Sequence, residues 1–571
     1  MQGRTRPTRL TAVLLAGAAV LGAYAAFVAV SGGFDIHIAG VRLRSHAWIR
    51  PALPAAVLAA AWVVAARRGI AATAARAWTV LDSGGTARAL VVVAALWSAA
   101  AGVLFGTYAA GGADSYGYVS QSLLLAEGRL TDRVPGDLTE HWRLPLWTLT
   151  PLGFVPGSRQ PVIAPSYPPG FPLLLAPFAA LSHSGVYLLV PLLGAVAVWL
   201  CYRVGCGMGD GLAGGVGAAL LSVSPTFLFQ IVQPMSDVPV TAFWLLAMLL
   251  AVRGRAAGGW AAGAAASIAL LIRPNLAPLA SIPAALVVHA AAGERLRAAA
   301  RFLAPIAVAG AALAWIQYTR YGSLFASGYG NLDDLFALEN VLPNLARYPR
   351  WLTETHTPFI WLFVLAPALV RRPSRPLAVG AVLFSAGVLA VYLPYVRFGL
   401  HEWTYSRFML PAIALMLPGA AAVALSLVRR LPPAGATLAT LAVFGGLAAF
   451  GLLTAERRLA FDLREGEQRY VRAGEFVRQR LPENAIVLAS QHSGSVRLYG
   501  RRPIVRWDLV APDELDSTLV KLRESGRMPF MVLDAFELKP FHGRFGAAGQ
   551  RAVEEARLIR LMGSVQIYAF D

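Results

Sequence analysis

Lysine is absent from the first 454 residues, although these residues include 31 arginines and 15 acidic side chains. The full chain of 571 residues carries a net charge of +19, which could suggest a nucleic-acid partner. The tail, residues 455–571, however, holds 19 basic and 16 acidic residues. The positive excess therefore lies among apolar segments, where arginine reports membrane topology and contact with anionic lipids. We expect membrane lipids, and no nucleic acid, as partners.

Charged residues of both signs are scarce, at 14% of the chain, whereas 57% of the residues are hydrophobic. The mean hydropathy is +0.57. Soluble domains carry about 25% charged residues, so this composition indicates an integral membrane protein. Cysteine is almost absent, since only Cys201 and Cys206 occur. A disulfide framework is not supported, and without a nearby His or further Cys we interpret both as packing residues rather than metal ligands.

Apolar runs of spanning length, separated by arginine clusters or turn residues, predict about 13 membrane spans. They cover approximately residues 10–31, 51–66, 88–107, 184–204, 211–230, 237–252, 258–272, 275–292, 302–320, 358–370, 377–397, 408–428 and 435–454.

Arginine also predicts the topology, because the inner loops of membrane proteins are enriched in it. With the N-terminus inside, nearly every predicted inner loop carries arginine, and an odd number of spans places the tail outside. Ala23-Tyr24-Ala25 imitates a signal-peptidase site. The first run nevertheless has about 20 residues, enough to cross a bilayer, so we interpret it as an uncleaved anchor with a cytoplasmic N-terminus.

The unusual polar residues fall on the predicted outer side. Residues 32–50 alternate in a pattern typical of a small hairpin. The Asp114 loop, residues 108–183, begins after an apolar run, and its Asp114 either belongs to a functional site or caps a short helix that begins at Ser115. Residues 115–127 have helical spacing, and residues 165–172 contain four prolines that fix a turn. The outer side therefore predicts a single outward-facing site.

The order of these pieces resembles the GT-C glycosyltransferases. In particular, it is similar to the branch that uses polyprenyl-phosphate sugars, including bacterial protein mannosyltransferase-like and aminoarabinose-transferase-like enzymes. The matching pieces are Asp114 after the first core span, the aromatic helix behind it, the turn at Tyr167-Pro168-Pro169-Gly170, the segment Gln233 to Asp237, and the segment Tyr405 to Pro411. The likeness covers about residues 88–454.

The resemblance implies a polytopic α-helical membrane protein with a GT-C-like bundle, in a bacterial inner (plasma) membrane. It also implies a glycosyltransferase that moves a sugar from a polyprenyl-phosphate donor to an acceptor glycan, lipid or protein on the periplasmic face. We expect two extra spans in residues 1–87, the catalytic membrane domain in residues 88–454, and an extracytoplasmic α/β domain in the tail. A transporter or lipid flippase is the main alternative; an assembly or scaffold protein whose work is done by the tail is a third.

The same resemblance implies roles for individual residues. Asp114 would be the general base, and Asp237 would be a second acid or, equally, a helix N-cap. The lipid phosphate needs positive charge, and without lysine only arginine can supply it; Arg407 matches the family segment best. Arg273, Arg320 and Arg397 are weaker candidates, for which snorkelling to the headgroups is the favoured explanation. Tyr116, Tyr118, Tyr167, His401 and Glu402 complete the predicted substrate-binding set, with a plain interfacial position as the alternative for His401 and Glu402.

Two further features leave alternatives open. A divalent cation held by Asp114, Asp237 and Glu402 together is conceivable, although no ligand spacing demands one. In the tail, a helix at 467–481, a strand at 485–489, a helix at 513–525 and strands at 530–533 and 565–569 are typical of an α/β domain. Residues 490–495 follow the first of these strands and either face the acceptor or form a plain turn.

Overall fold

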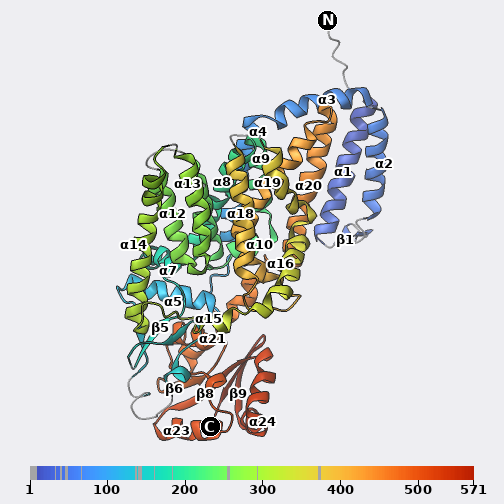
Figure 1. Ribbon diagram of the computed structural model, residues 1–571. Helices are drawn as coiled ribbons and strands as arrows, with labels where there is room; N and C mark the ends of the chain where they lie inside the picture. Colours follow the sequence, from blue (N-terminus) through green and yellow to red (C-terminus); the bar gives the residue numbers. More distant parts are fainter. Residues whose placement is uncertain are drawn as a thin grey trace. The chain divides into compact units, whose positions relative to one another are not determined.

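The computed structural model describes residues 9–31, 34–38, 41–45, 49–65, 67–135, 138, 145–159, 161–182, 184–253, 258–291, 293–370 and 374–570 (Figure 1). The chain divides into two compact units, one of residues 1–83 and 426–443 and one of residues 84–425 and 444–571. The fold is mostly helical.

The described part of the first unit contains three whole helices, a hairpin, the last residues of α19 (Leu410–Val428) and the start of α20. Its elements are α1 Arg9–Ser31, β1 Phe34–Ile38, β2 Val41–Ser45, α2 Ile49–Ala65, α3 Arg67–Leu81 and the beginning of α20 Pro433–Arg457. Helices α1 and α2 run side by side (Figure 1). Strands β1 and β2 are antiparallel, with Phe34 opposite Ser45, so the hairpin predicted for residues 32–50 is confirmed.

The second unit contains most of the apolar helices. They are α4 Gly84–Leu104, α8 Leu189–Met208, α9 Gly211–Ser222, α10 Pro225–Ile231, α11 Asp237–Ala251, α12 Gly258–Ile272, η3 Pro274–Ala280, α13 Ser281–Ala290, α14 Arg295–Tyr321, α16 Val341–His356, η5 Pro358–Leu365, α17 Ala366–Leu369, α18 Arg375–Tyr392, η7 Trp403–Met409 and α19 Leu410–Val428. Short elements α15 Leu332–Leu335 and η4 Leu338–Asn340 lie between α14 and α16.

Among the described residues, six helices are long and apolar enough to cross a membrane, or seven if the bent pair α9 and α10 is one span. The pair bends by 60° because α10 has its own start, where Ser224 Oγ accepts a hydrogen bond from the Phe227 amide and Pro225 follows. Several other predicted spans correspond to apolar helices of 10–17 residues. The structure thus confirms a polytopic helical fold, and the number of 13 crossings stays a prediction.

In its described residues, the Asp114 loop folds into helices and a small sheet rather than a purely irregular connection. Its elements are α5 Asp114–Ala126, β3 Asp132–Arg133, η1 Leu146–Leu149, β4 Phe154–Pro156, β5 Val162–Pro165 and α7 Gly170–Leu181, followed by η2 Gly185–Tyr187. The strands form one antiparallel sheet in the order β3-β5-β4. Helices α5 and α7 pack against each other.

The tail contains a five-stranded sheet in the order β7-β6-β8-β10-β9. Its elements are α21 Leu463–Arg480, β6 Ala485–Leu488, α22 Ser493–Leu498, β7 Ile504–Val505, η8 Trp507–Leu509, α23 Leu515–Glu524, β8 Met528–Asp534, η9 Ala535–Glu537, α24 Leu538–Glu555, β9 Arg557–Met562 and β10 Val565–Ala569. Strands β7, β6 and β8 are parallel, whereas β10 and β9 are antiparallel additions. The contacts group the tail with residues 84–425, so a separate domain stays a prediction.

Alternate side chains of the tail strands enter two hydrophobic cores. On one face Val487, Val532 and Ile567 pack with Ala473 and Val477 of α21. On the other face the core is shared with the Asp114 loop. Its members include Leu488, Met531, Leu533, Trp507, Phe541 and Phe545 from the tail, and Tyr116, Leu124, Leu146, Leu149, Phe154 and Ile163 from the loop. The loop and the tail therefore fold against each other.

Candidate active site

A cavity of about 410 Å³ lies between the Asp114 loop and the apolar helices of the second unit. Its charged lining residues are Asp114, Arg273, Arg320 and Arg407. Six tyrosines also line it: Tyr118, Tyr167, Tyr321, Tyr329, Tyr392 and Tyr395. The remaining lining is largely apolar. A single acid among three arginines and a tyrosine-rich wall would suit an anionic ligand that carries hydroxyl groups.

Asp114 lies in the first turn of α5 and is held by two side chains from distant segments. The Tyr167 hydroxyl donates to Oδ1 at 2.6 Å, and Arg407 Nη2 donates to Oδ2 at 2.8 Å. The residue before the helix is Ala113, and no side-chain cap bond is formed there. The simple capping alternative for Asp114 is therefore wrong, because both of its oxygens are engaged in the cavity instead.

The surroundings of Asp114 keep its carboxyl group ionised. Burial alone would raise its pKa, but the charge of Arg407 and the hydrogen bonds from Tyr167 and Arg407 outweigh burial. The net pKa of Asp114 lies below its usual range. The side chain is still 33% exposed, so it remains within reach of a ligand in the cavity.

Tyr167 reaches Asp114 because α5 has a glycine beneath the tyrosine ring. A Cβ atom at Gly117 would lie 2.3 Å from Tyr167 Cε2, a distance that no side chain permits. The ring also contacts that of Tyr118, with centroids 4.7 Å apart. The prolines at 168 and 169 restrict the backbone that follows. Thus the proline-rich turn brings Tyr167 onto the helix that carries Asp114.

Arg407 belongs to η7, and among the described residues it forms a hydrogen bond only with Asp114. Its Nε is buried and has no hydrogen-bond partner within the described part of the chain. A guanidinium group has five N–H donors, and a buried donor without a partner is unfavourable. The rings of Phe408 and Tyr405 lie 5.1 Å and 5.7 Å from the guanidinium carbon and limit its movement. Arg407 is therefore fixed in place with donors free to bind a ligand.

Arg273 differs from Arg407, because its donors are already used by the protein. It donates to Ser236, to Tyr392 and, at 2.6 Å, to Asp237 Oδ1. Its residue is only 9% exposed, so snorkelling to the headgroups is wrong for Arg273. The ion pair with the buried Asp237 carboxylate keeps the Arg273 side chain inside the protein.

Asp237 is fully buried in the first turn of α11, and the residue at the N-cap position is Ser236. The N-cap alternative for Asp237 is therefore wrong. Asp237 is also not among the residues that line the cavity, and its contact with the site runs through Arg273. Its role as a second acid stays a prediction.

The other predicted residues lie at different distances from the cavity. Arg320 lines it but is 1% exposed, and its Nε donates to the Leu130 carbonyl, so snorkelling is wrong for it too. Arg397, His401 and Glu402 are exposed and are not part of the cavity lining. Tyr116 is buried against Phe154, with centroids 5.8 Å apart, and also does not line it. Substrate contact by Tyr116, His401 and Glu402 stays a prediction.

The carboxylates do not fit a divalent cation. Within the described residues, no three His, Cys, Asp or Glu side chains gather as metal ligands. Asp114 and Asp237 are each paired with an arginine, and Glu402 accepts a hydrogen bond from the Gly399 amide outside the cavity lining. Two arginine charges beside the acids would repel a cation. We therefore derive no step that uses a metal.

Sequence reasoning missed six aromatic residues of the cavity lining: Tyr321, Tyr329, Phe336, Tyr392, Tyr395 and Phe408. Phe408 stacks on Tyr392, with centroids 4.7 Å apart and an interplanar angle of 8°, and it lies beside both Arg273 and Arg407. Tyr392 and Tyr395 were placed inside a predicted span. The enrichment of tyrosine at the ends of spans was the available signal.

Comparison with known proteins identifies the fold. The sequence matches no protein-family profile and no curated protein. ArnT from Cupriavidus metallidurans bound to undecaprenyl phosphate is 13% identical, over 86% of this chain and 98% of its own, with a TM-score of 0.51. The chain therefore has the GT-C fold. Apo ArnT from the same organism is 12% identical, over 85% of this chain and 98% of its own, with a TM-score of 0.50. The GT-C fold suggested by the sequence is thus confirmed.

Proposed function

We propose that this protein is a glycosyltransferase that moves a sugar from a polyprenyl-phosphate-linked donor to an acceptor on the outer face of a bacterial inner membrane. The observation that carries the proposal is the pairing of Asp114 with Arg407, which are 293 residues apart in sequence and share one cavity. The GT-C fold supports the proposal, since ArnT was solved with undecaprenyl phosphate bound. Nothing in the described part of the chain supports the transporter alternative.

Arg407 is the proposed ligand of the donor phosphate. Its buried Nε has no hydrogen-bond partner among the described residues, whereas the donors of Arg273 already bind Ser236, Tyr392 and Asp237. An arginine binds phosphate oxygens through two parallel N–H bonds, and it would stabilise the charge that develops on the leaving phosphate. Arg273 then acts at a distance, by its charge and by holding Tyr392 and Phe408.

Asp114 is the proposed general base. It would take the proton from the acceptor hydroxyl or amine as that group attacks the anomeric carbon. The bond between the anomeric carbon and the phosphate oxygen breaks, its electron pair stays on the phosphate, and polyprenyl phosphate leaves. The attack from the opposite side inverts the anomeric centre. The protonated Asp114 then releases its proton to water.

Arg407 contacts Asp114 and is also the proposed ligand of the donor phosphate, so donor binding and activation of the base should occur in a set order. In the ligand-free protein Arg407 lowers the pKa of Asp114, which makes the carboxylate a weak base. A phosphate that binds Arg407 would neutralise much of that positive charge, and the basicity of Asp114 would rise. We therefore infer that donor binding activates Asp114, so that the base becomes effective only when the donor is present.

The test uses the purified full-length protein in lipid nanodiscs, with a panel of undecaprenyl-phosphate sugars that each carry a labelled sugar. Membrane and envelope extracts supply the acceptors. The proposal expects at least one donor to lose its label to an acceptor, with release of one undecaprenyl phosphate for each sugar transferred. Binding of these lipids without transfer of any labelled sugar, while donor appears on the opposite leaflet, would favour a flippase instead.

A further inference from the structure

The tail forms hydrogen bonds with the link, residues 105–113, which connects the end of α4 to Asp114. Gln468 Nε2 donates to the Thr107 carbonyl at 2.8 Å, and the Ala110 amide donates to the Tyr499 hydroxyl at 2.8 Å. Both tail residues come from elements that are more than 350 residues away in sequence. Helix α5 begins at Asp114, four residues after Ala110. The position of Asp114 therefore depends on contacts made by the tail.

Gly111 of the link packs directly against Tyr470 of the tail. A Cβ atom at Gly111 would lie 2.1 Å from Cδ2 and 2.5 Å from Cε2 of Tyr470. These ring atoms belong to a residue that is 2% exposed, so the ring has no free space into which to retreat. Only glycine fits at position 111 while Tyr470 keeps its place.

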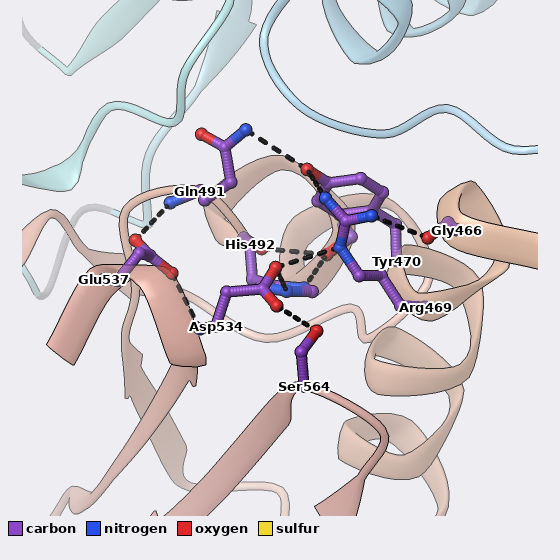
Figure 2. A network of polar contacts seen from close by, with 9 residues as sticks. Gly466, Arg469, Tyr470, Gln491, His492, Asp534, Glu537 and Ser564 are labelled. Carbon is purple, nitrogen blue, oxygen red and sulfur yellow. Dashed lines mark hydrogen bonds and ion pairs between the residues drawn. The ribbon is translucent and has the colours of Figure 1, made fainter. Parts of the chain in front are cut away.

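A buried polar network fixes Tyr470 in turn (Figure 2). The Tyr470 hydroxyl accepts hydrogen bonds from Gln491 Nε2 at 3.1 Å and from Arg469 Nη2 at 3.0 Å. Arg469 Nε donates to Asp534 Oδ2 at 2.9 Å, and the backbone amide of Gln491 donates to Glu537 Oε1 at 3.0 Å. The network thus connects Tyr470 to the end of β8, which lies in the centre of the tail sheet.

Asp534 is the centre of this network. Besides Arg469, it accepts a hydrogen bond from Ser564 Oγ and contacts His492 Nε2 at 3.2 Å (Figure 2). Burial would raise its pKa, but the hydrogen bonds from His492 and Ser564 and the charge of Arg469 hold it at about 2. The Asp534 carboxylate therefore stays ionised throughout the physiological pH range.

The network also resembles a nucleophilic triad, since Ser495 Oγ lies 3.3 Å from His492 Nδ1. However, Ser495 is 1% exposed, and its hydroxyl already donates to the His492 carbonyl at 3.0 Å. A substrate could not reach this serine. The arrangement suits support of a neighbouring site better than catalysis of its own.

We propose that the tail positions the base of the transferase: the Asp534 network fixes Tyr470, Tyr470 fixes Gly111, and Gly111 sets the place of Asp114. This proposal rests on the function proposed above for Asp114. Within the described residues, all those that line the cavity precede residue 409, so no tail residue touches the reacting groups directly. Tyr470 and its partners are therefore positioning residues.

The experiment combines Gly111→Ala, which adds a methyl group, with Tyr470→Ala, which removes the ring that this methyl group would meet. Gly111→Ala forces the link away from Tyr470, and a displacement of about 1 Å at a catalytic group lowers turnover about 10²-fold. Tyr470→Ala on its own loosens the link and is expected to lower turnover less. The double variant should recover to about the level of Tyr470→Ala, because the added methyl group then meets only the flexible end of Glu467, whose Oε2 would lie 2.6 Å from that Cβ atom. Gly543→Ala is the matched control, since a Cβ atom there would meet nothing within 4 Å.

Two readouts separate positioning from a general loss of structure. Undecaprenyl phosphate affinity should be retained in Gly111→Ala, because Arg407 is untouched. Amide hydrogen exchange should rise in residues 107–117 and stay at the wild-type level in the helices that line the rest of the cavity. If Gly111→Ala fails to fold, Tyr470→Phe, which keeps the ring but removes the hydroxyl that accepts from Arg469 and Gln491, should show the same pattern at smaller size.

Asp114→Asn, measured in the same series, distinguishes the two proposals. Wild-type turnover in Asp114→Asn overturns the role of Asp114 and, with it, this inference. Loss of turnover in Asp114→Asn together with wild-type turnover in Gly111→Ala overturns the positioning role alone. A double variant that is no better than Gly111→Ala overturns it as well, because relief of the contact with Tyr470 would then have no effect.

Discussion

Removal of the Tyr167 hydroxyl should change the pH dependence of the enzyme in a direction set by the structure. Tyr167 donates to Asp114 Oδ1 at 2.6 Å, and this bond stabilises the ionised carboxylate. Tyr167→Phe keeps the ring over Gly117 and removes only that bond. The pKa of Asp114 should therefore rise toward its usual value.

The size of the change follows from the strength of the bond. A hydrogen bond to a charged group contributes about 1.5–3 kcal/mol, and one pKa unit corresponds to about 1.4 kcal/mol. The expected rise is thus about one to two units, and because Asp114 is 33% exposed, solvent screening favours about one unit. A base must be ionised to act, so its activity falls as the pH drops through its pKa. A raised pKa moves this acidic limb to higher pH.

The assay is the pH profile of turnover at saturating donor, in nanodiscs, for the wild type and Tyr167→Phe. Tyr118→Phe is the matched control, because the Tyr118 hydroxyl binds Ser236 at 3.0 Å rather than Asp114. The control should leave the acidic limb in place even where it changes the maximal rate. An acidic limb that is identical in Tyr167→Phe and the wild type would refute the assignment of Asp114 as the titrating base.

Arg407→Lys keeps the charge but loses the paired N–H groups of the guanidinium, so affinity for the sugar donor and turnover should both fall. Arg407→Ala should lower both quantities further. Unchanged values would place the phosphate elsewhere. Arg273→Met leaves the Asp237 carboxylate buried without its partner, which should destabilise the fold by about 3–5 kcal/mol in thermal unfolding, and Asp237→Asn in the same chain should restore part of it. Equal unfolding temperatures for the wild type and Arg273→Met would contradict the buried pair. A reporter fused after Asp571 should be active only outside the cytoplasm, and activity inside would reverse the predicted topology.

Three residues of the site could be predicted from the sequence, because they lie in segments with a recognisable pattern. Asp114, Tyr167 and Arg407 lie in segments with unusual composition, and the structure brings all three into one cavity. Their mutual contacts could not be predicted, since they depend on the packing of α5 under Tyr167. That packing is possible only because residue 117 is glycine, which has no Cβ atom to meet the Tyr167 ring.

Other features depended on tertiary contacts that leave no periodic signal. The pairing of Asp237 with Arg273 joins α11 to the residue between α12 and η3, and each residue alone resembles an ordinary cap or an interfacial arginine. In the tail, the predicted helix at 467–481 and the strands at 485–489, 530–533 and 565–569 match α21, β6, β8 and β10. The strand β7 was missed because its two buried residues are too few to show a period, and the edge strand β9 was missed because it shows neither a buried nor a strictly alternating pattern.

The most direct test of the account is a single-turnover measurement with Asp114→Asn and the wild type, each loaded with the labelled donor that the panel identifies. Acceptor is then added, and both sugar transfer and release of undecaprenyl phosphate are followed. The account predicts that Asp114→Asn binds the donor at least as tightly as the wild type, since Arg407 is free of its carboxylate partner, while transfer slows by about 10²–10⁴-fold. Transfer at the wild-type rate by Asp114→Asn would contradict it.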